Sequence, residues 1–535
     1  MEIRGDSTKW VTTLLMLYSA LWVGIDGSSR QPHIILILAD DLGWDDVSFH
    51  GSDQIPTPNI DYLAYNGVIL HNYYVQPICT PTRSALMTGR HPIHTGLQHN
   101  VIVAPQPYGL RPNETTMAEY LKPLGYATHM IGKWHLGFFA KEYTPTYRGF
   151  DSYYGYYCGH MDYYTHNVQW SKYWGYDMHK NMEVEWPTFG EYSTELFTTE
   201  AEKILKSHNP DKPLFLYLAY QAVHSANNKV PLQAPYKYTS RFPYIHDEKR
   251  RTFAGMLSAL DDSIGNITRT LHQTGLYDNS VIIFSTDNGG PPAGFDMNYA
   301  SNWPLRGTKA TLWEGGVRGD GFINSPLLEK PQRISSNMIH VTDWLPTLYH
   351  LAGGNMSDLP TNLYGVNVWN TLSRGDPSPR TEILHNIDSL QHTAALRVGD
   401  YKLIIGDAYN GKWSGWYQPE EVTTSMFRTK MGRNISVSHD PRAAVVHCGK
   451  KPANASTNCQ PKQKPCLYNV ILDPCEYHNI AEQYPDVVND MLNRLTEYNS
   501  TAVEPQHPPE DPKCDPKYHK EAWVPWINLT DSDTV

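Results

Sequence analysis

Three carboxylates and one amide in this chain offer the oxygen ligands that a hard cation prefers. The set contains no cysteine and needs no histidine, which favours Ca²⁺ or Mg²⁺ over Zn²⁺. Holding three carboxylates together without a cation would be costly, because like charges at short range repel each other. If the fold brings them together, these residues form a metal site: Asp40, Asp41, Asp287 and Asn288.

Two lysines and two histidines add groups suited to an anionic substrate. Lysine donates hydrogen bonds to anions, and histidine exchanges protons near neutral or mildly acidic pH. Each of them alone could equally be a hydrogen-bonded interior residue. Their number and placement favour a role in binding and proton transfer for Lys133, His135, His224 and Lys309.

Most of these residues directly follow one of four short apolar runs. The runs, 33–38, 127–131, 214–219 and 281–285, are typical of buried strands, and segments 194–207 and 252–271 have the apolar spacing of amphipathic helices. This alternation predicts an α/β fold, with a mostly parallel sheet covered by helices on both faces. Such sheets bind ligands at the carboxyl ends of their strands, so the reactive residues should share one site.

The chain changes character after Pro377 and Pro379. Two strand-like runs, 394–398 and 401–405, flank Gly399-Asp400, a strong hairpin signal. Residues 410–465 have little periodicity, so we expect a long surface segment that is held in place by disulfides. The pattern of residues 485–499 predicts a closing helix. We expect a catalytic domain over 28–390 and a smaller antiparallel α+β domain over 391–535.

The amino terminus predicts entry into the secretory pathway. Arg4 and Lys9 precede an apolar run over 10–23, which is short for a membrane span and typical of a secretory signal. We expect a signal peptide over 1–27 and a lysosomal or secreted protein without a stable membrane span; a retained anchor is the alternative. Seven glycosylation sequons fit this route: Asn113, Asn266, Asn355, Asn434, Asn454, Asn499 and Asn528.

Seven cysteines in an oxidising compartment leave at least one outside any set of intrachain disulfides. Five of them lie after residue 440, whereas Cys79 stands far from that group and is the candidate for a chemical role. The remaining positions are Cys158, Cys448, Cys459, Cys466, Cys475 and Cys514, and the sequence leaves their connectivity open.

The composition excludes two classes of partner. Hydrophobic residues make up 40% of the chain, enough for a packed globular core. The net charge is −11, from 44 Lys and Arg against 55 Asp and Glu. Nucleic acids and acidic membranes need a basic surface, so neither is an expected partner.

The segment CTPTRSALMTGR over 79–90 carries the most specific pattern. Cys-x-Pro-x-Arg followed by Thr-Gly resembles the signature of the type I sulfatases, whose cysteine is oxidised to Cα-formylglycine (3-oxoalanine). Further segments resemble the same family in the same order: ADDLGW at 39–44, GKWHLG at 132–137, STDNGG at 285–290 and LWEGGVR at 312–318. Within the family, TGLQH at 95–99, NWPLRG at 302–307 and HNID at 385–388 resemble the arylsulfatase B subgroup, the N-acetylgalactosamine-4-sulfatases.

The resemblance implies an alkaline-phosphatase/sulfatase-like fold and a sulfuric ester hydrolase with one Ca²⁺. It implies that Asp40, Asp41, Cys79, Asp287 and Asn288 hold the calcium, and that a formylglycine-generating enzyme modifies Cys79 during maturation. The hydrated aldehyde at this position would supply the nucleophile that attacks sulfur. The implied substrate is a sulfated sugar, N-acetylgalactosamine 4-sulfate units of glycosaminoglycans.

The resemblance also implies a role for each remaining residue. Arg83 steadies the metal-bound hydroxyls, and Lys133 and Lys309 hold sulfate oxygens. His224 binds the substrate and protonates the departing alcohol, whereas His135 takes the proton whose loss expels sulfate.

Two other functions fit the same residues. A phosphate or phosphonate monoesterase of the same superfamily would use the same anion site, and relative turnover of aryl sulfate and aryl phosphate distinguishes it. A catalytically silent protein would bind sulfated glycans without turnover. We rank both below the sulfatase, because every proposed catalytic position is filled.

Overall fold

The four apolar runs form adjacent strands of one large sheet, as predicted. A computed structural model describes residues 30–419 and 442–529. In it β10 (Ser280–Thr286), β1 (His33–Ala39), β9 (Leu214–Ala219) and β3 (Ala127–Lys133) lie side by side and parallel. Every residue of β1, β9 and β10 is buried, as expected for central strands covered on both faces.

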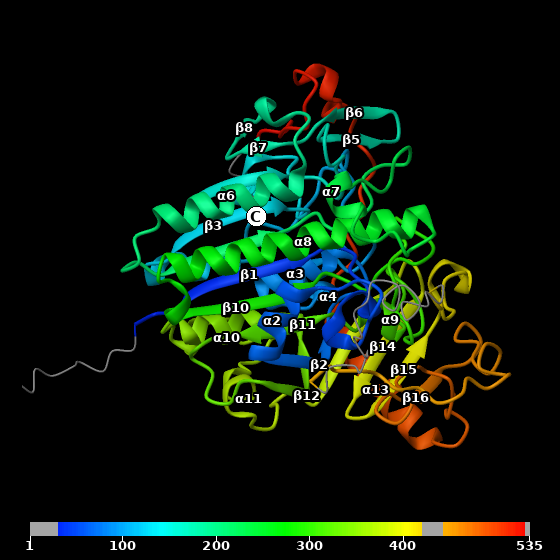
Figure 1. Ribbon diagram of the computed structural model, residues 1–535. Helices are drawn as coiled ribbons and strands as arrows, with labels where there is room; N and C mark the ends of the chain where they lie inside the picture. Colours follow the sequence, from blue (N-terminus) through cyan, green and yellow to red (C-terminus); the bar gives the residue numbers. More distant parts are fainter. Residues whose placement is uncertain (1–29, 420–441, 530–535) are drawn as a thin grey trace, which may run out of the picture. The chain divides into compact units, whose positions relative to one another are not determined.

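The complete sheet has ten strands in the order β12-β2-β11-β10-β1-β9-β3-β4-β7-β8 (Figure 1). It is mixed, because β11 pairs antiparallel with both of its neighbours, and β7 and β8 add an antiparallel edge. A separate hairpin joins β5 and β6. The bounds are β2 Val68–Tyr74, β4 Ser152–Tyr156, β5 Asn167–Trp170, β6 Tyr173–Tyr176, β7 His179–Lys180, β8 Glu183–Val184, β11 Gly321–Asn324 and β12 Arg333–His340.

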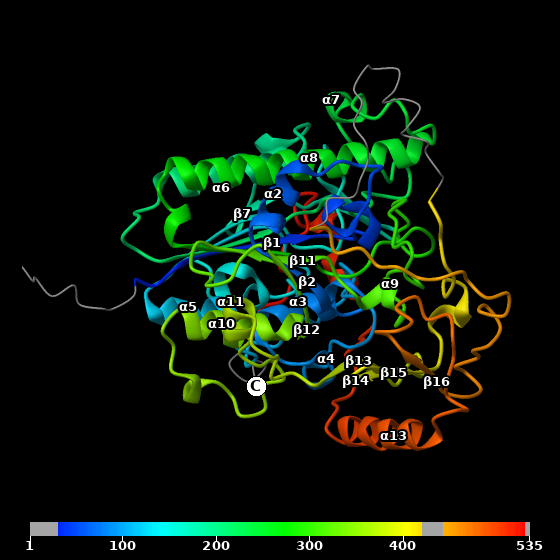
Figure 2. The same cartoon turned by 60° about the horizontal axis from the view of Figure 1, so that its bottom comes forward.

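Helices cover both faces of the sheet (Figure 2). One face carries α2 (Pro58–Asn66), α6 (Ser193–Ser207) and α8 (Glu248–Gln273), and the other carries α3 (Cys79–Thr88), α5 (Met117–Leu121) and α10 (Trp344–Leu351). The two amphipathic helices predicted from spacing are therefore α6 and α8. Shorter helices are α4 Pro92–Thr95, α7 Tyr236–Thr239, α9 Glu314–Val317 and α11 Trp369–Arg374.

The apolar spacing of α8 explains its place on the sheet. Apolar side chains that recur at every third or fourth position are fully buried in the core: Phe253, Leu257, Leu260 and Ile264. The helix begins after Asp247, whose carboxylate accepts the backbone N–H groups of Lys249 and Arg250. The helix runs beside the sheet, and a short connection leads from it to the start of β10 (Figure 1).

The predicted hairpin belongs to a small antiparallel sheet. Its strands are β13 (Glu382–Asp388), β14 (Thr393–Val398), β15 (Tyr401–Ile405) and β16 (Cys466–Asn469), and the predicted closing helix is α13 (Pro485–Ser500). Two disulfides, Cys448–Cys475 and Cys459–Cys466, join the predicted surface segment to residues in and after β16. The strand β13 precedes residue 390, and the division into two domains at that residue stays a prediction.

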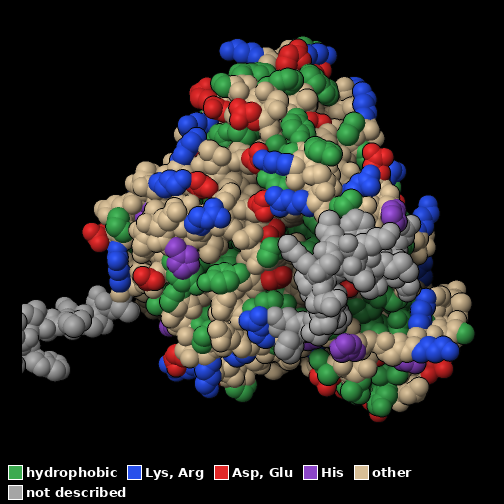
Figure 3. Space-filling model, viewed as in Figure 1, with side chains coloured by type: hydrophobic (Ala, Val, Ile, Leu, Met, Phe, Trp, Pro, Cys, Tyr) green, Lys and Arg blue, Asp and Glu red, His purple; other side chains and the backbone are tan. Residues whose placement is uncertain are grey.

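Acidic and basic side chains are interspersed over the face shown in Figure 3. Among the described residues, no helix combines the length and apolar character needed to cross a bilayer. Five sequon asparagines are exposed and Asn266 is half-buried, whereas Asn434 and the predicted signal peptide lie outside the described residues. The exposed ones are Asn113, Asn355, Asn454, Asn499 and Asn528.

Asp320 is a buried carboxylic acid beside the large sheet. It is 1% exposed, and neither carboxyl oxygen has a conventional hydrogen bond. Its nearest polar neighbour is His50, with Nε2 3.3 Å from Oδ1. Burial, followed by repulsion from Asp46 and Asp45, raises the pKa of Asp320 well above 3.8. Since His50 Nδ1 lies 3.2 Å from a carbonyl oxygen, a protonated Asp320 can donate to the lone pair on Nε2.

We predict that Asp320→Asn stabilises the protein increasingly as the pH rises. The folded-state pKa of Asp320 lies above its unfolded value, so its contribution to stability is full below the unfolded pKa and is lost as the pH rises toward the folded pKa. Asparagine keeps the shape and has no such loss. The difference in unfolding free energy should grow as the pH rises above the ordinary Asp pKa of 3.8, by at most about 1.4 kcal/mol per pH unit. Denaturant unfolding measures it, with exposed Asp376→Asn as control; a pH-independent difference contradicts the prediction.

Candidate active site

The carboxyl ends of the central strands bring the predicted residues together, around the start of α3. Possible ligand atoms of Asp40, Asp41, Cys79 and His224 all lie within 4.8 Å of one another. All four residues are buried. Residues that follow separate strands therefore lie close together at one place in the structure.

Asp40 lies between the thiol and two cations. Lys133 Nζ donates to its Oδ2 at 2.7 Å, and Arg83 lies 3.5 Å from the same oxygen. The Cys79 thiol lies 3.7 Å from Oδ1. Burial alone would raise the pKa of Asp40, but the charges of Lys133, His224 and Arg83 lower it. Asp40 is therefore a carboxylate, as a metal ligand must be.

Asp41 and Asn288 form the second part of the oxygen cluster. Asn288 Nδ2 donates to Asp41 Oδ1 at 2.7 Å, and Lys309 Nζ donates to Asp41 Oδ2 at 2.8 Å. The amide oxygen of Asn288 is buried and has no hydrogen-bond partner. A buried orphan acceptor beside carboxylates is what a hard cation would satisfy, so this set fits Ca²⁺.

Asp287 completes the set by pairing with Arg83. The guanidinium donates to Oδ2 through Nε at 3.2 Å and through Nη2 at 2.8 Å, and both side chains are fully buried. Arg83 also donates to the Lys133 carbonyl. Arg83 thus links α3 to the last residue of β3 and to the residue that follows β10.

Cys79 is the first residue of α3 and is 1% exposed. Burial, followed by repulsion from Asp287, raises the pKa of its thiol well above the usual value. A neutral thiol is a poor nucleophile. The unmodified cysteine is therefore badly placed to attack an anion, although the amino terminus of a helix favours a bound anion.

His135 is held as a neutral imidazole with one free ring nitrogen. Its Nε2 lies 2.9 Å from the Ile102 carbonyl oxygen, which can only accept, so Nε2 carries the hydrogen. Nδ1 is buried without a hydrogen-bond partner. Burial, Lys133 and Arg83 keep the pKa of His135 well below its usual range. The arrangement presents a lone pair that can take a proton.

The pKa of His224 is shifted in the opposite direction to that of His135. Its Nδ1 lies 2.6 Å from the Ser225 carbonyl, and its Nε2 faces Asp41 at 3.5 Å and Asp296 at 3.4 Å. Burial and Lys309 favour the neutral ring, but Asp41 and Asp40 raise the pKa of His224 above its ordinary value. Nε2 also lies 3.1 Å from Lys309 Nζ, which can only donate, so in this arrangement Nε2 presents its lone pair to Lys309 and can hold a proton for donation only once that contact opens.

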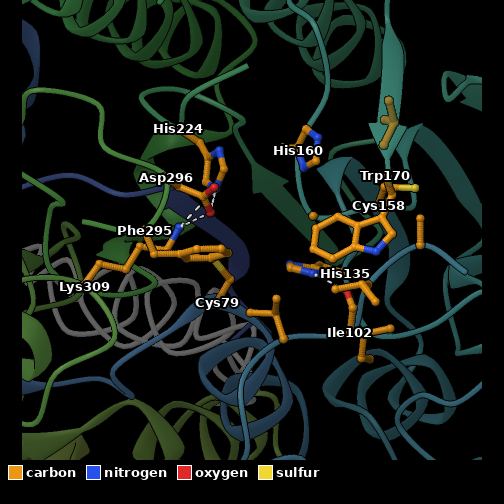
Figure 4. Close-up of a pocket in the computed structure, with 15 residues that line it drawn as sticks. Cys79, Ile102, His135, Cys158, His160, Trp170, His224, Phe295, Asp296 and Lys309 are labelled. Atoms are coloured by element: carbon orange, nitrogen blue, oxygen red, sulfur yellow. Dashed lines mark hydrogen bonds and ion pairs between the residues drawn. The ribbon is translucent and has the colours of Figure 1, made fainter. Parts of the chain in front are cut away.

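Four of the predicted residues, Cys79, His135, His224 and Lys309, line a cavity of about 30 Å³. In Figure 4 Cys79, Lys309, Asp296 and His224 lie on one side, and His135, His160, Cys158 and Trp170 lie on the other. The sequence prediction did not include Asp296, which lies 3.0 Å from Lys309 Nζ, nor Trp170 on the opposite wall. No pattern marked Asp296, because it stands in a loop rather than after a strand.

Comparison with known proteins decides the family. The sequence model of the sulfatases matches residues 32–354, more than half of the chain. The chain belongs to the sulfatase family. Arylsulfatase J of Mus musculus is 43% identical over 523 residues, which cover 94% of this sulfatase and 81% of the relative. N-acetylgalactosamine-6-sulfatase of Homo sapiens is 29% identical over 445 residues, covering 80% and 82%.

Solved structures confirm the sulfatase-like fold predicted from the resemblance. The crystal structure of Ps i-CgsB has a TM-score of 0.71 and 27% identity, covering 89% of this sulfatase and 94% of that chain. The same protein has also been solved with k-i-k-neocarrahexaose, a bound carbohydrate.

The subgroup resemblance needs a correction. Three segments suggested arylsulfatase B, whereas the relative at 43% identity is an arylsulfatase J. Two of those segments lie beside functional loops, since NWPLRG ends two residues before Lys309 and TGLQH contains His99, which pairs with Asp388 of HNID. Three short segments separate subgroups less well than a comparison over 523 residues.

Proposed function

We propose that this sulfatase removes sulfate from N-acetylgalactosamine 4-sulfate units of glycosaminoglycans, using formylglycine at position 79 and one Ca²⁺. The observation that carries the proposal is that Cys79, His135, His224 and Lys309 line one cavity, while Asp40 and Asp41 cluster with Cys79 and are contacted by Lys133 and Asn288. Relatives named N-acetylgalactosamine-6-sulfatase support a sulfated N-acetylgalactosamine, and the choice of the 4-sulfate rests on the segment resemblance alone.

The balance of charge supports a cation as part of the site. The cluster holds one more carboxylate than it holds permanent cations, with Asp40, Asp41, Asp287 and Asp296 against Arg83, Lys133 and Lys309. A divalent cation would make the set net positive. Such a site would attract the anionic sulfate ester more strongly than the side chains alone.

The proposed chemistry divides between the modified residue, the metal and this chain's side chains. The hydrated aldehyde would supply the attacking oxygen, and Ca²⁺ held by Asp40, Asp41, Asp287 and Asn288 would polarise the sulfate. Lys133 and Lys309 stabilise charge on the sulfate oxygens. His224 donates a proton to the departing sugar oxygen, and His135 Nδ1 accepts a proton on the opposite side of the cavity.

Maturation in the secretory pathway is part of the proposal. A formylglycine-generating enzyme would act on Cys79 before the chain folds, because the side chain is buried afterwards. The mature protein would then reach the lysosome or be secreted. Signal-like residues 1–27 and the five exposed sequon asparagines support this route.

The mass of tryptic peptide 31–83 tests the modification. Protein from a eukaryotic secretory host should yield this peptide with the aldehyde in place of the Cys79 thiol. An unmodified thiol, in a host that modifies other sulfatases, would contradict the formylglycine proposal. A glycan-binding role without turnover would then become the better explanation.

Turnover of two sugar sulfates that differ only in the position of the sulfate tests the proposed substrate. We expect kcat/KM for an N-acetylgalactosamine 4-sulfate oligosaccharide to exceed that for the 6-sulfate by about tenfold or more. A higher kcat/KM for the 6-sulfate would show that the 6-sulfate is the substrate. The assignment of the protein as a sulfatase would be unaffected. Higher kcat/KM for aryl phosphate than for aryl sulfate would favour the phosphatase alternative.

We predict that Asp296→Ala tightens inhibition by inorganic sulfate. The Asp296 carboxylate pairs with Lys309 at 3.0 Å and with His224 at 3.4 Å, so it competes with sulfate for the same groups. Removing it should lower the inhibition constant of sulfate by about tenfold, as expected when one close like charge is lost. Asp262→Ala, at an exposed ion pair with Arg241, is the control. Weaker inhibition would instead show that Asp296 holds Lys309 in position for sulfate.

A further inference from the structure

Two buried cysteines remain outside the two disulfides of the described chain and outside the proposed chemistry. Cys158 is 3% exposed and Cys514 is 1% exposed. If Cys79 becomes formylglycine, which rests on the proposed function, an even number of cysteines remains and four of them are paired. Cys158 and Cys514 are then the pair left in an oxidising compartment.

The two cysteines come from segments that lie against each other. The backbone N–H of Cys158 donates to the Asp177 carboxylate at 2.8 Å. Two residues before Asp177, Gly175 packs so closely on Pro516 that an added Cβ would lie 2.5 Å from the proline Cβ. Pro516 stands two residues after Cys514. A short path of contacts therefore joins the surroundings of both thiols.

A second path approaches Cys514 from the cavity wall. Asp511 N–H donates to the Pro105 carbonyl at 2.8 Å, and Cys514 N–H donates to the Asp511 carbonyl at 3.1 Å. Ala104, the neighbour of Pro105, lines the same cavity as Cys158. Two segments next to Cys514 therefore each contact residues that lie near Cys158.

The two thiols also interact electrostatically. Burial raises the pKa of Cys158, Asp177 raises it further, and the Cys514 thiol adds to the shift. Burial likewise raises the pKa of Cys514 to about 12. Thiols with raised pKa exchange slowly, so pairing would precede complete burial and the bond would then resist reductants.

We propose that Cys158 and Cys514 form a third disulfide, which fastens the carboxyl-terminal segment to the wall of the active-site cavity. Both S–H bonds break and one S–S bond forms. The two hydrogens reduce a disulfide of the glutathione or protein-thiol class to two thiols, so atoms and electrons balance.

The bond would act on the cavity through neighbouring contacts. Trp170, which lines the cavity, donates to the Glu510 carboxylate at 3.1 Å. Val168, another lining residue, accepts from the Trp523 indole at 3.2 Å. Cys514 stands between these two anchor residues of the same segment, so a disulfide there would hold both contacts in place.

Non-reducing peptide mapping of the wild-type protein tests the proposal. After alkylation under denaturing conditions, tryptic peptides 149–172 and 514–517 should appear as one linked species, two hydrogens lighter than their sum. Recovery of both cysteines as alkylated thiols would overturn the proposal, as would a link from either one to another cysteine or a second chain. Cys79 is read separately in peptide 31–83, so failure of the disulfide and failure of the formylglycine proposal are distinguishable.

Serine variants test the energetic role. Cys158→Ser, Cys514→Ser and the double variant should each lower the melting temperature by about 5 °C, because all three remove the same link. Additive losses would show that the two residues act independently and would overturn the proposal. Cys514→Ser is the more informative single variant, because Cys514 does not line the cavity whereas Cys158 does.

Discussion

Cys79→Ala should lower sulfate-ester turnover by about 10⁴-fold or more while the protein still folds. The variant removes the atom that formylglycine formation requires, and Cys79 is the one thiol in the described cluster with Asp40, Asp41 and His224. The fold should survive, because the thiol makes a single weak contact, 3.7 Å from Asp40, and alanine is a good helix former.

The control for Cys79→Ala is Cys79→Ser, which restores a hydroxyl at the same position. Serine lacks the second hydroxyl of a hydrated aldehyde, so we expect this variant to be nearly as inactive as alanine. Thermal unfolding of both variants should stay close to that of wild type. Substantial multiple-turnover activity in either variant would contradict the formylglycine mechanism.

His224→Ala should lower kcat on sugar sulfates by about 10³-fold. The reason is that an alcohol leaves poorly without a proton, and His224 combines a raised pKa with an Nε2 that faces the cavity groups Lys309 and Asp296. An aryl sulfate with an acidic phenol needs little protonation. Its kcat should therefore fall by less than about tenfold, and the contrast between the two substrates is the diagnostic measurement.

His160→Ala is the matched control for this experiment. His160 lines the same cavity, with its ring centroid 6.5 Å from that of His224 and nearly parallel to it, but no ion pair joins it to the carboxylates. Its loss should leave the ratio of sugar sulfate to aryl sulfate turnover unchanged. Equal losses on both substrates in His224→Ala would show that His224 binds sulfate rather than protonating the leaving group.

Local sequence patterns determined most of the fold. The central strands β1, β9 and β10 were predictable because both of their faces are buried, which leaves a continuous apolar run. The helices α6 and α8 were predictable from their apolar spacing, and the β14–β15 hairpin from Gly399-Asp400. Residues that follow such strands were expected to meet, because parallel strands end at one edge.

Other features were decided only when distant segments met. Asp296 reaches Lys309 and His224 from a loop whose path no periodicity encodes. The lone pair of His135 depends on Ile102, a residue far from it in sequence, and the surroundings of Cys514 depend on how the carboxyl-terminal segment packs on Gly175. The physical reason is that residue type and spacing fix local conformation and which face is buried, whereas hydrogen-bond partners, burial of charge and cavity walls are set by tertiary packing.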